Sequence, residues 1–249
     1  MTSLGIIGGM APPSTVEYYK AAIEIHRRWT GGRAPRVLVN SIDGDEVFAA
    51  LSAGRHEQVA VLLSEGLRQL AAGGATVALL ASASVHVAFD RIRINSPVPL
   101  IDIVDATVDA SEGLHRIGLF ATSFTTKADL FGPTLRARGR TLVIPTDREQ
   151  DHLQRIYFDE LVRGRFLPDS RERILDIAQR MHDDEGIDGV MLAGTELPLL
   201  LPEKAYAGVR FIDTARAHVE AAVRAMLSEA PARKQLARPI GKDPRDIPG

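Results

Sequence analysis

The 249-residue sequence contains no cysteine. Disulfide bonds, thiolate metal sites and every mechanism that uses a thiol as base or nucleophile are therefore excluded. Histidine is also sparse, and none of the seven residues has a metal-ligand spacing such as HExxH, so we expect no metal. We expect no other cofactor, because the glycine-rich turn near the start is neither a dinucleotide fingerprint nor a P-loop.

The sequence lacks an excess of charge of either sign. Thirty Lys and Arg residues stand against 32 Asp and Glu residues, so no overall field attracts nucleic acid or an anionic membrane. No apolar run approaches the roughly 20 residues of a membrane span, and the opening MTSLGIIGGM has no basic region of a signal peptide. We therefore expect a cytoplasmic protein whose partner is a small molecule.

Short apolar runs alternate with longer segments of helical period, which is typical of parallel strands joined by crossover helices. The expected strands are 4–8, 36–41, 77–81, 100–103, 117–121, 141–144, 190–193 and 211–212. The expected helices are 15–30, 57–73, 170–185 and 214–229. This order predicts an α/β fold.

The second half of the sequence repeats the first. LGIIGGM recurs as IGLFATS, VALLASAS as VMLAGTEL, and LIDIVDATVDA as FIDTARAHVEA, in the same order and at a nearly constant offset. We therefore expect two pseudo-symmetric Rossmann-like lobes, each a parallel sheet flanked by helices, with the site in the cleft between them. Lobe 1 is expected to comprise 1–98 plus 213–228, and lobe 2 to comprise 99–212. The Pro-rich, basic segment 229–249 is expected to be a disordered or surface-draped tail.

Two strand-to-helix turns carry hydroxyl side chains that could hold a carboxylate. In the first turn, glycines permit close backbone approach, and Ser14 or Thr15 is placed to cap the helix that follows. The matching turn in the second half offers Thr122, Ser123 and Thr125. Amides and hydroxyls at a helix start favour an anion, so we expect a substrate carboxylate there. Helix capping alone is the alternative interpretation.

The turns after the third strand of each lobe hold the candidate acid and base groups. The first contains Ser82, Ser84 and His86, and the second contains Thr195 and Glu196. The pKa of an ordinary histidine lies near working pH, so His86 is a candidate general acid or base, with Glu196 opposite it. A histidine that orders a loop and a glutamate that caps a turn are the competing interpretations.

Four segments, LGIIGGMAPPSTVEYY, APRVLVNSID, RIGLFATSFTTKADLF and IYFDELVRGRF, resemble blocks of the cofactor-independent aspartate/glutamate racemase family. The resemblance runs from about residue 4 to about residue 227. It implies a homodimer and a small amino-acid or carboxylate ligand, and Arg163 matches a position that can help to hold a substrate carboxylate. The candidate substrate-binding residues are Gly9, Met10, Ser14, Thr15, Ser41, Ser84, Thr122, Ser123, Thr125, Lys127, Arg163 and Gly194.

The sequence departs from this family at the two thiols. The family motifs Cys-Asn-Thr-Ala-His and Gly-Cys-Thr-Glu read SASVH and AGTE here, so Ser82 and Gly194 stand at the two cysteine positions. The chain is thus identified as a divergent member without catalytic cysteines. The segment SIDGDEVFAAL also lacks an arginine that some aspartate racemases have there, which counts against aspartate as the ligand.

Three hypotheses remain open at this point. The first is an enzyme that acts on a small amino acid or dicarboxylic acid by one-sided proton transfer, such as isomerisation, decarboxylation or elimination. Its candidate catalytic residues are Ser82, His86, Thr195 and Glu196. The second is racemisation by bases other than thiols, one on each face of the carbon. The third is a binder or regulator that retains the carboxylate-holding turns without the chemistry.

Overall fold

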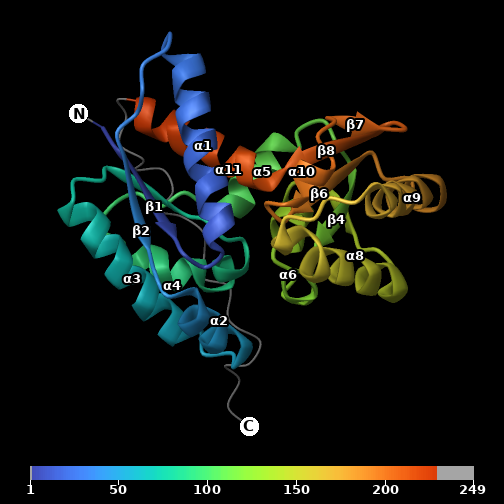
Figure 1. Cartoon of the computed structure of the whole chain (residues 1–249), viewed down its shortest axis with the longest axis horizontal. Helices are drawn as coiled ribbons and strands as arrows, with labels where there is room; N and C mark the ends of the chain where they lie inside the picture. The colour runs from blue at the N-terminus through green and yellow to red at the C-terminus, as the bar shows by residue number, and fades with distance from the viewer. Residues whose placement is uncertain (1, 229–249) are drawn as a thin grey trace.

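The computed structural model describes residues 2–228, and the expected tail at 229–249 lies outside the described residues. Figure 1 shows two lobes side by side, each built around its own sheet. The first sheet has the order β2-β1-β3 and the second has the order β5-β4-β6-β8-β7. The predicted α/β fold with two similar lobes is therefore confirmed.

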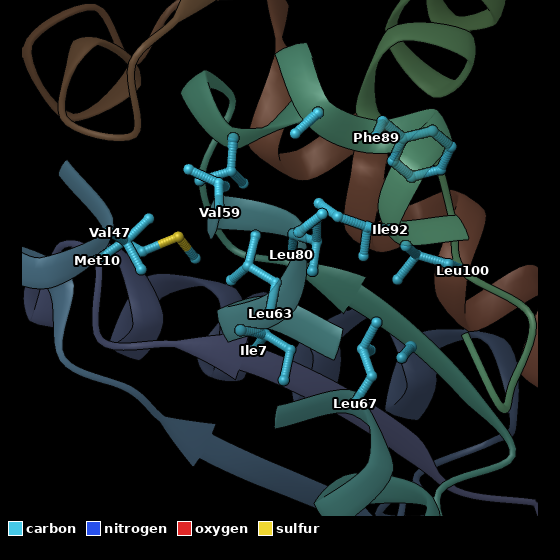
Figure 2. Packing of buried hydrophobic residues seen from close by; sticks show 14 of the residues in the cluster. Ile7, Met10, Val47, Val59, Leu63, Leu67, Leu80, Phe89, Ile92 and Leu100 are labelled. Carbon is cyan, nitrogen blue, oxygen red and sulfur yellow. The ribbon is translucent and has the colours of Figure 1, made fainter. Parts of the chain in front are cut away.

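Lobe 1 is a three-layer sandwich around a parallel sheet. Its strands are β1 (Leu4–Gly8), β2 (Val37–Ser41) and β3 (Val77–Leu80). Its own helices are α1 (Pro12–Trp29), α2 (Gly44–Ser52), α3 (His56–Ala72) and α4 (Phe89–Ile94). Figure 2 shows the core between the sheet and α2, α3 and α4, where Ile7 and Leu80 pack against Leu63 and Leu67. Leu4 and Ile6 point to the other face and pack against α1, because side chains alternate along a strand.

Lobe 2 repeats this arrangement with an added antiparallel edge strand. Its strands are β4 (Arg116–Ala121), β5 (Thr141–Val143), β6 (Gly189–Ala193), β7 (Ala205–Tyr206) and β8 (Val209–Asp213). Its helices are α6 (Ser123–Lys127), α7 (Gly132–Ala137), α8 (Asp147–Asp159), α9 (Pro168–Glu185) and α10 (Leu197–Leu200). Phe120 faces the core under α8 and α9, while Ile117 and Leu119 face the opposite layer.

Two helices are exchanged between the lobes. Helix α5 (Ile103–Ala110) follows the end of the first sheet, yet its Val104 and Val108 pack in the core of lobe 2. Helix α11 (Thr214–Leu227) follows β8 of lobe 2, yet its Val219 and Val223 pack on the first sheet beside α1. The two helices also contact each other, and Figure 1 places them between the lobes. The core of each lobe is therefore completed by a helix that follows the other lobe's sheet in the chain.

The expected strand at 100–103 is wrong. Only Leu100 pairs with the sheet, by a parallel bridge to Ala78, and α5 begins at Ile103. The Asp102 side chain accepts the Val104 N–H and caps this helix, which ends the extended segment. Leu100 thus packs in the core of lobe 1, whereas the expected lobe 2 begins at residue 99.

Helix α1 also begins earlier than expected. It starts at Pro12 rather than at residue 15, because a proline in the first turn needs no intrahelical N–H bond. Ser14 and Thr15 therefore lie inside the first turn and do not cap the helix, which opens without a side-chain cap. Among the described residues, no helix is both long and apolar enough to cross a membrane.

Candidate active site in the cleft between the lobes

A cavity of about 460 Å³ lies between the lobes, where β1, β3, β4 and β6 end. This volume suits a small ligand. Hydroxyl side chains from both lobes line it, namely Ser14, Ser82, Ser84, Thr122, Ser123, Thr125 and Thr195. The carboxyl ends of parallel strands meet at the same edge of a sheet, which is why residues far apart in sequence come together here.

The turn between β1 and α1 forms the floor of the lobe 1 side. Gly9 has φ +91°, and a Cβ there would lie 2.1 Å from the Ile42 carbonyl oxygen, so only glycine fits. The Thr15 hydroxyl accepts the Gly9 N–H at 3.0 Å and fixes the turn. Met10 and Ser14 consequently face the cavity, whereas Gly9 and Thr15 hold them from beneath and do not line it.

A hydroxyl-carboxylate cluster forms the wall contributed by lobe 2. The Glu196 carboxylate is only 6% exposed and accepts hydrogen bonds from Tyr157 at 2.5 Å, Thr195 at 2.9 Å and Ser14 at 3.3 Å. The hydroxyls of Ser14 and Thr195 are also 2.5 Å apart, so the cluster joins α1 of lobe 1 to lobe 2. All three hydroxyl residues line the cavity, while Glu196 lies behind them.

Tyr157 lies against the turn at Gly194. A Cβ on Gly194 would be 2.5 Å from Cε2 of the Tyr157 ring and 3.3 Å from its hydroxyl oxygen, so the ring occupies the space of a side chain there. Burial raises the pKa of Tyr157 above its ordinary value, and the negative charge and hydrogen bond of Glu196 raise it further. The phenol therefore keeps its proton at neutral pH and donates it to Glu196.

The outer part of the cavity is apolar. Its large apolar side chains come from α2, from α6 and from the end of α8 with the turn after it, and they are Phe48, Leu51, Phe124, Phe158 and Val162. Phe158 is 46% exposed, so its ring adds open apolar surface to the cavity lining. No residue with a formal charge lines the cavity among the residues that the structure describes.

Neither of the two expected basic contacts lines this cavity. Lys127 ends α6 and Arg163 lies in the turn after α8, and both side chains are exposed outside the cavity lining. Ser41, at the exposed end of β2, does not line it either. The polar groups that this cavity offers to a ligand are therefore neutral.

His86 is not placed to exchange protons with a ligand. The 3₁₀ turn Ser84–Ala88 directs its ring away from the cavity, onto Phe89 and 5.4 Å from the ring of His218. Its Nδ1–H donates to the Ser82 carbonyl at 2.9 Å, and its Nε2 has no hydrogen-bond partner among residues 2–228. Burial, together with the nearby His218, lowers the pKa of His86 to about 3, so the ring stays neutral.

Nine of the predicted site residues do line the cavity: Met10, Ser14, Ser82, Ser84, Thr122, Ser123, Thr125, Gly194 and Thr195. Gln154, Tyr157 and Phe158, which share one face of α8, also line the cavity and were not predicted from the sequence. A signal for this helix was present, because Thr146 and Glu149 form the capping box Thr-x-x-Glu. No group of three potential metal ligands was found within residues 2–228.

The fold and the cavity together define a two-lobed α/β protein with a small-molecule pocket at the strand ends of both sheets. The chain belongs to the Asp/Glu/hydantoin racemase family, whose sequence model matches residues 7–222. The suspected family resemblance is thereby confirmed.

Solved structures with this fold carry racemase names. A candidate Asp/Glu racemase from Yersinia pestis is 28% identical, with a TM-score of 0.82 over 92% of this chain and all of its own. An aspartate racemase homologue from Pyrococcus horikoshii is 31% identical, with a TM-score of 0.80 and the same coverage. The aspartate racemase of Picrophilus torridus, at 21% identity, shares the fold with a TM-score of 0.73 over 91% of this chain and 94% of its own.

Proposed function

We propose that this protein is an enzyme that binds a small carboxylic acid between its lobes and moves a proton at the carbon next to the carboxylate. It does so without a cofactor and without a thiol. The observation that carries this proposal is the buried Glu196 carboxylate, which three hydroxyl groups link to the cavity. A carboxylate connected to a ligand site through hydroxyl groups is a source and a sink for protons.

The proton transfer is confined to one face of the substrate. The lobe 2 wall carries the Glu196 cluster, whereas the matching position in lobe 1 carries Ser82. Within residues 2–228, the Ser82 hydroxyl makes no hydrogen bond to a carboxylate. A serine without an adjacent base is a poor proton acceptor at neutral pH. Because only the lobe 2 side carries an acid-base group, we expect exchange, isomerisation or decarboxylation with a fixed stereochemical outcome. We do not expect racemisation, which needs such a group on both sides.

The proposed substrate carries an uncharged, largely apolar substituent. A second carboxylate on the ligand would meet no cation among the described lining residues and would lie near Glu196. Burying such a charge unpaired is costly. Phe48, Phe124 and Phe158 instead offer apolar surface to an aryl or branched alkyl group, while Thr122 and Ser123 offer hydroxyl donors to the carboxylate.

Proton NMR in D₂O tests this function. The purified protein is incubated separately with L-phenylglycine, phenylmalonate, L-aspartate and L-glutamate, and α-proton exchange, new products and ligand line broadening are followed together. We expect exchange with retained configuration or product formation for L-phenylglycine, and neither for phenylmalonate and the two acidic amino acids, each of which carries a second carboxylate. Glu196→Gln should lower the turnover rate by about 100-fold or more, while Glu112→Gln, at an exposed position, should leave it unchanged.

Two outcomes would replace this proposal with a competing one. Exchange accompanied by inversion would require a base on each face and would support racemisation without thiols. Line broadening of a ligand with no exchange or consumption would support a binder or regulator on the racemase fold.

A further inference from the structure

We propose that the Tyr157 hydroxyl is the group that carries the proton between Glu196 and the substrate carbon. This inference rests on the proposed function and identifies which of the three hydroxyls at the Glu196 carboxylate performs the transfer. Ser14, Tyr157 and Thr195 all line the cavity and all donate to Glu196, so geometry has to distinguish them.

The distances favour Tyr157. Its hydrogen bond to Glu196 is the shortest of the three, at 2.5 Å against 2.9 Å for Thr195 and 3.3 Å for Ser14. Short O–H···O⁻ bonds are the strong, charge-assisted ones, and they permit a proton to move with little rearrangement. Ser14 and Thr195 are also engaged with each other at 2.5 Å, which ties them into the bridge between the lobes.

The place of the ring gives a second, independent argument. Gly194 directly follows β6, and the Tyr157 ring fills the space into which a side chain at this position would project. The phenol is thus delivered to the strand end of lobe 2 from α8 rather than from β6 itself. An absent side chain at Gly194 is what admits the ring, because a Cβ would overlap Cε2 at 2.5 Å.

The proton transfer balances in both directions. As the C–H bond next to the substrate carboxylate breaks, its electron pair moves into the carboxylate-conjugated system and the proton forms a new O–H bond with Tyr157. The original phenol proton passes at the same time to Glu196, which becomes neutral. In the return step, Tyr157 gives a proton to the carbon and recovers one from Glu196. The phenol therefore need not become a free phenolate beside the carboxylate.

Variants at the three hydroxyls separate their roles. L-Phenylglycine is the probe, its affinity is measured by ligand line broadening, and α-proton exchange is measured in D₂O. For Tyr157→Phe we expect an affinity for L-phenylglycine within about tenfold of that of the parent, because the loss of one neutral hydrogen bond changes a binding constant by about that much. Its exchange rate should fall by about 100-fold or more, as expected when a general acid-base group is removed. The control is Tyr206→Phe, at an exposed edge-strand position, which should match the parent in both measurements.

A double variant tests whether Tyr157 and Glu196 act as one unit. The double variant Tyr157→Phe/Glu196→Gln should exchange the α-proton no more slowly than the slower of the two single variants. The effects of two groups that act in one relay are not additive. Exchange by Tyr157→Phe at the parent rate would overturn this inference and leave the proposed function intact. Loss of exchange in Thr195→Val alone, with Tyr157→Phe active, would assign the relay to Thr195 instead. A parent protein with neither exchange nor product formation on any of the four compounds would overturn the proposed function and this inference together.

Discussion

Acidification from pH 7.5 to pH 5.0 is expected to lower the free energy of unfolding through two buried histidines, His86 and His218. The His218 ring donates from Nε2 to the Ile101 carbonyl at 2.8 Å and accepts the Tyr18 hydroxyl at Nδ1, 3.3 Å away. Burial lowers the pKa of His218 to about 4, and burial together with His218 lowers the pKa of His86 to about 3, both from 6.5. Both rings are therefore neutral in the folded protein across this pH range.

The size of the effect follows from proton linkage. Below pH 6.5 the unfolded chain takes up a proton at each ring that the folded protein rejects, so stability falls as pH falls. Each ring contributes about 1.4 kcal/mol per pH unit below 6.5, or about 2 kcal/mol at pH 5.0 and about 4 kcal/mol for the pair. The lowered pKa values of Glu24 and Glu149 act mainly below their ordinary 4.5. Burial raises the pKa of Asp213, which works in the opposite direction and moderates the loss.

Urea denaturation at the two pH values measures this difference. The variants His86→Gln and His218→Gln should each lose about half as much stability on acidification as the parent, because one ring then no longer titrates. His115→Gln, at an exposed position, serves as the control and should behave as the parent does. A parent loss below about 1 kcal/mol, or variants that keep the full pH dependence, would refute this account of the two rings.

Two further predictions concern the cavity. Gly194→Ala should lower the free energy of unfolding, measured by urea denaturation, by about 1–3 kcal/mol, because the new Cβ overlaps the Tyr157 ring. This loss should vanish in a Tyr157→Leu background, and equal losses in both backgrounds would contradict the overlap. Phe158→Ala should weaken the binding of L-phenylglycine by about tenfold through lost apolar contact, measured by ligand line broadening; unchanged affinity would place the substituent elsewhere in the cavity.

The layered fold was predictable because its signals are local. The repeated Ile-Asp pairs, Ile101-Asp102 and Ile212-Asp213, end extended segments and begin helices, and both aspartates cap the helix that follows. The expected lobes also placed 213–228 with lobe 1 and 99–212 with lobe 2, which puts α11 and α5 with the sheets that they pack on. What the pattern did not indicate is that 100–103 is not a strand, because Asp102 caps α5 and ends the extended segment after Leu100.

The site was predicted in part for the same reason. Ser82, Thr122 and Thr195 follow buried strands, so their place at the sheet edges followed from the strand pattern. His86 matched a motif position, but the 3₁₀ turn rotates its ring into the core. Tyr157 was missed because it lies 39 residues before Glu196, on a helix that the apolar pattern alone did not single out. Gly194 was predicted as a site residue because it stands at a cysteine position of the family motif. The side chain that occupies the space beside it is Tyr157, which comes from α8.

The exchange of α5 and α11 affects the order in which the two lobes can fold during synthesis. The strands of lobe 1 leave the ribosome before those of lobe 2, but one face of the lobe 1 sheet is covered by α11, at residues 214–227. Until that segment emerges, the growing chain exposes apolar side chains of β1 and β3, which is the condition under which nascent proteins aggregate or recruit chaperones. Helix α5, which packs in lobe 2, is made before β4, the first strand of the lobe 2 sheet. Lobe 2 can therefore complete its core before lobe 1, whose core stays incomplete until α11 has been made.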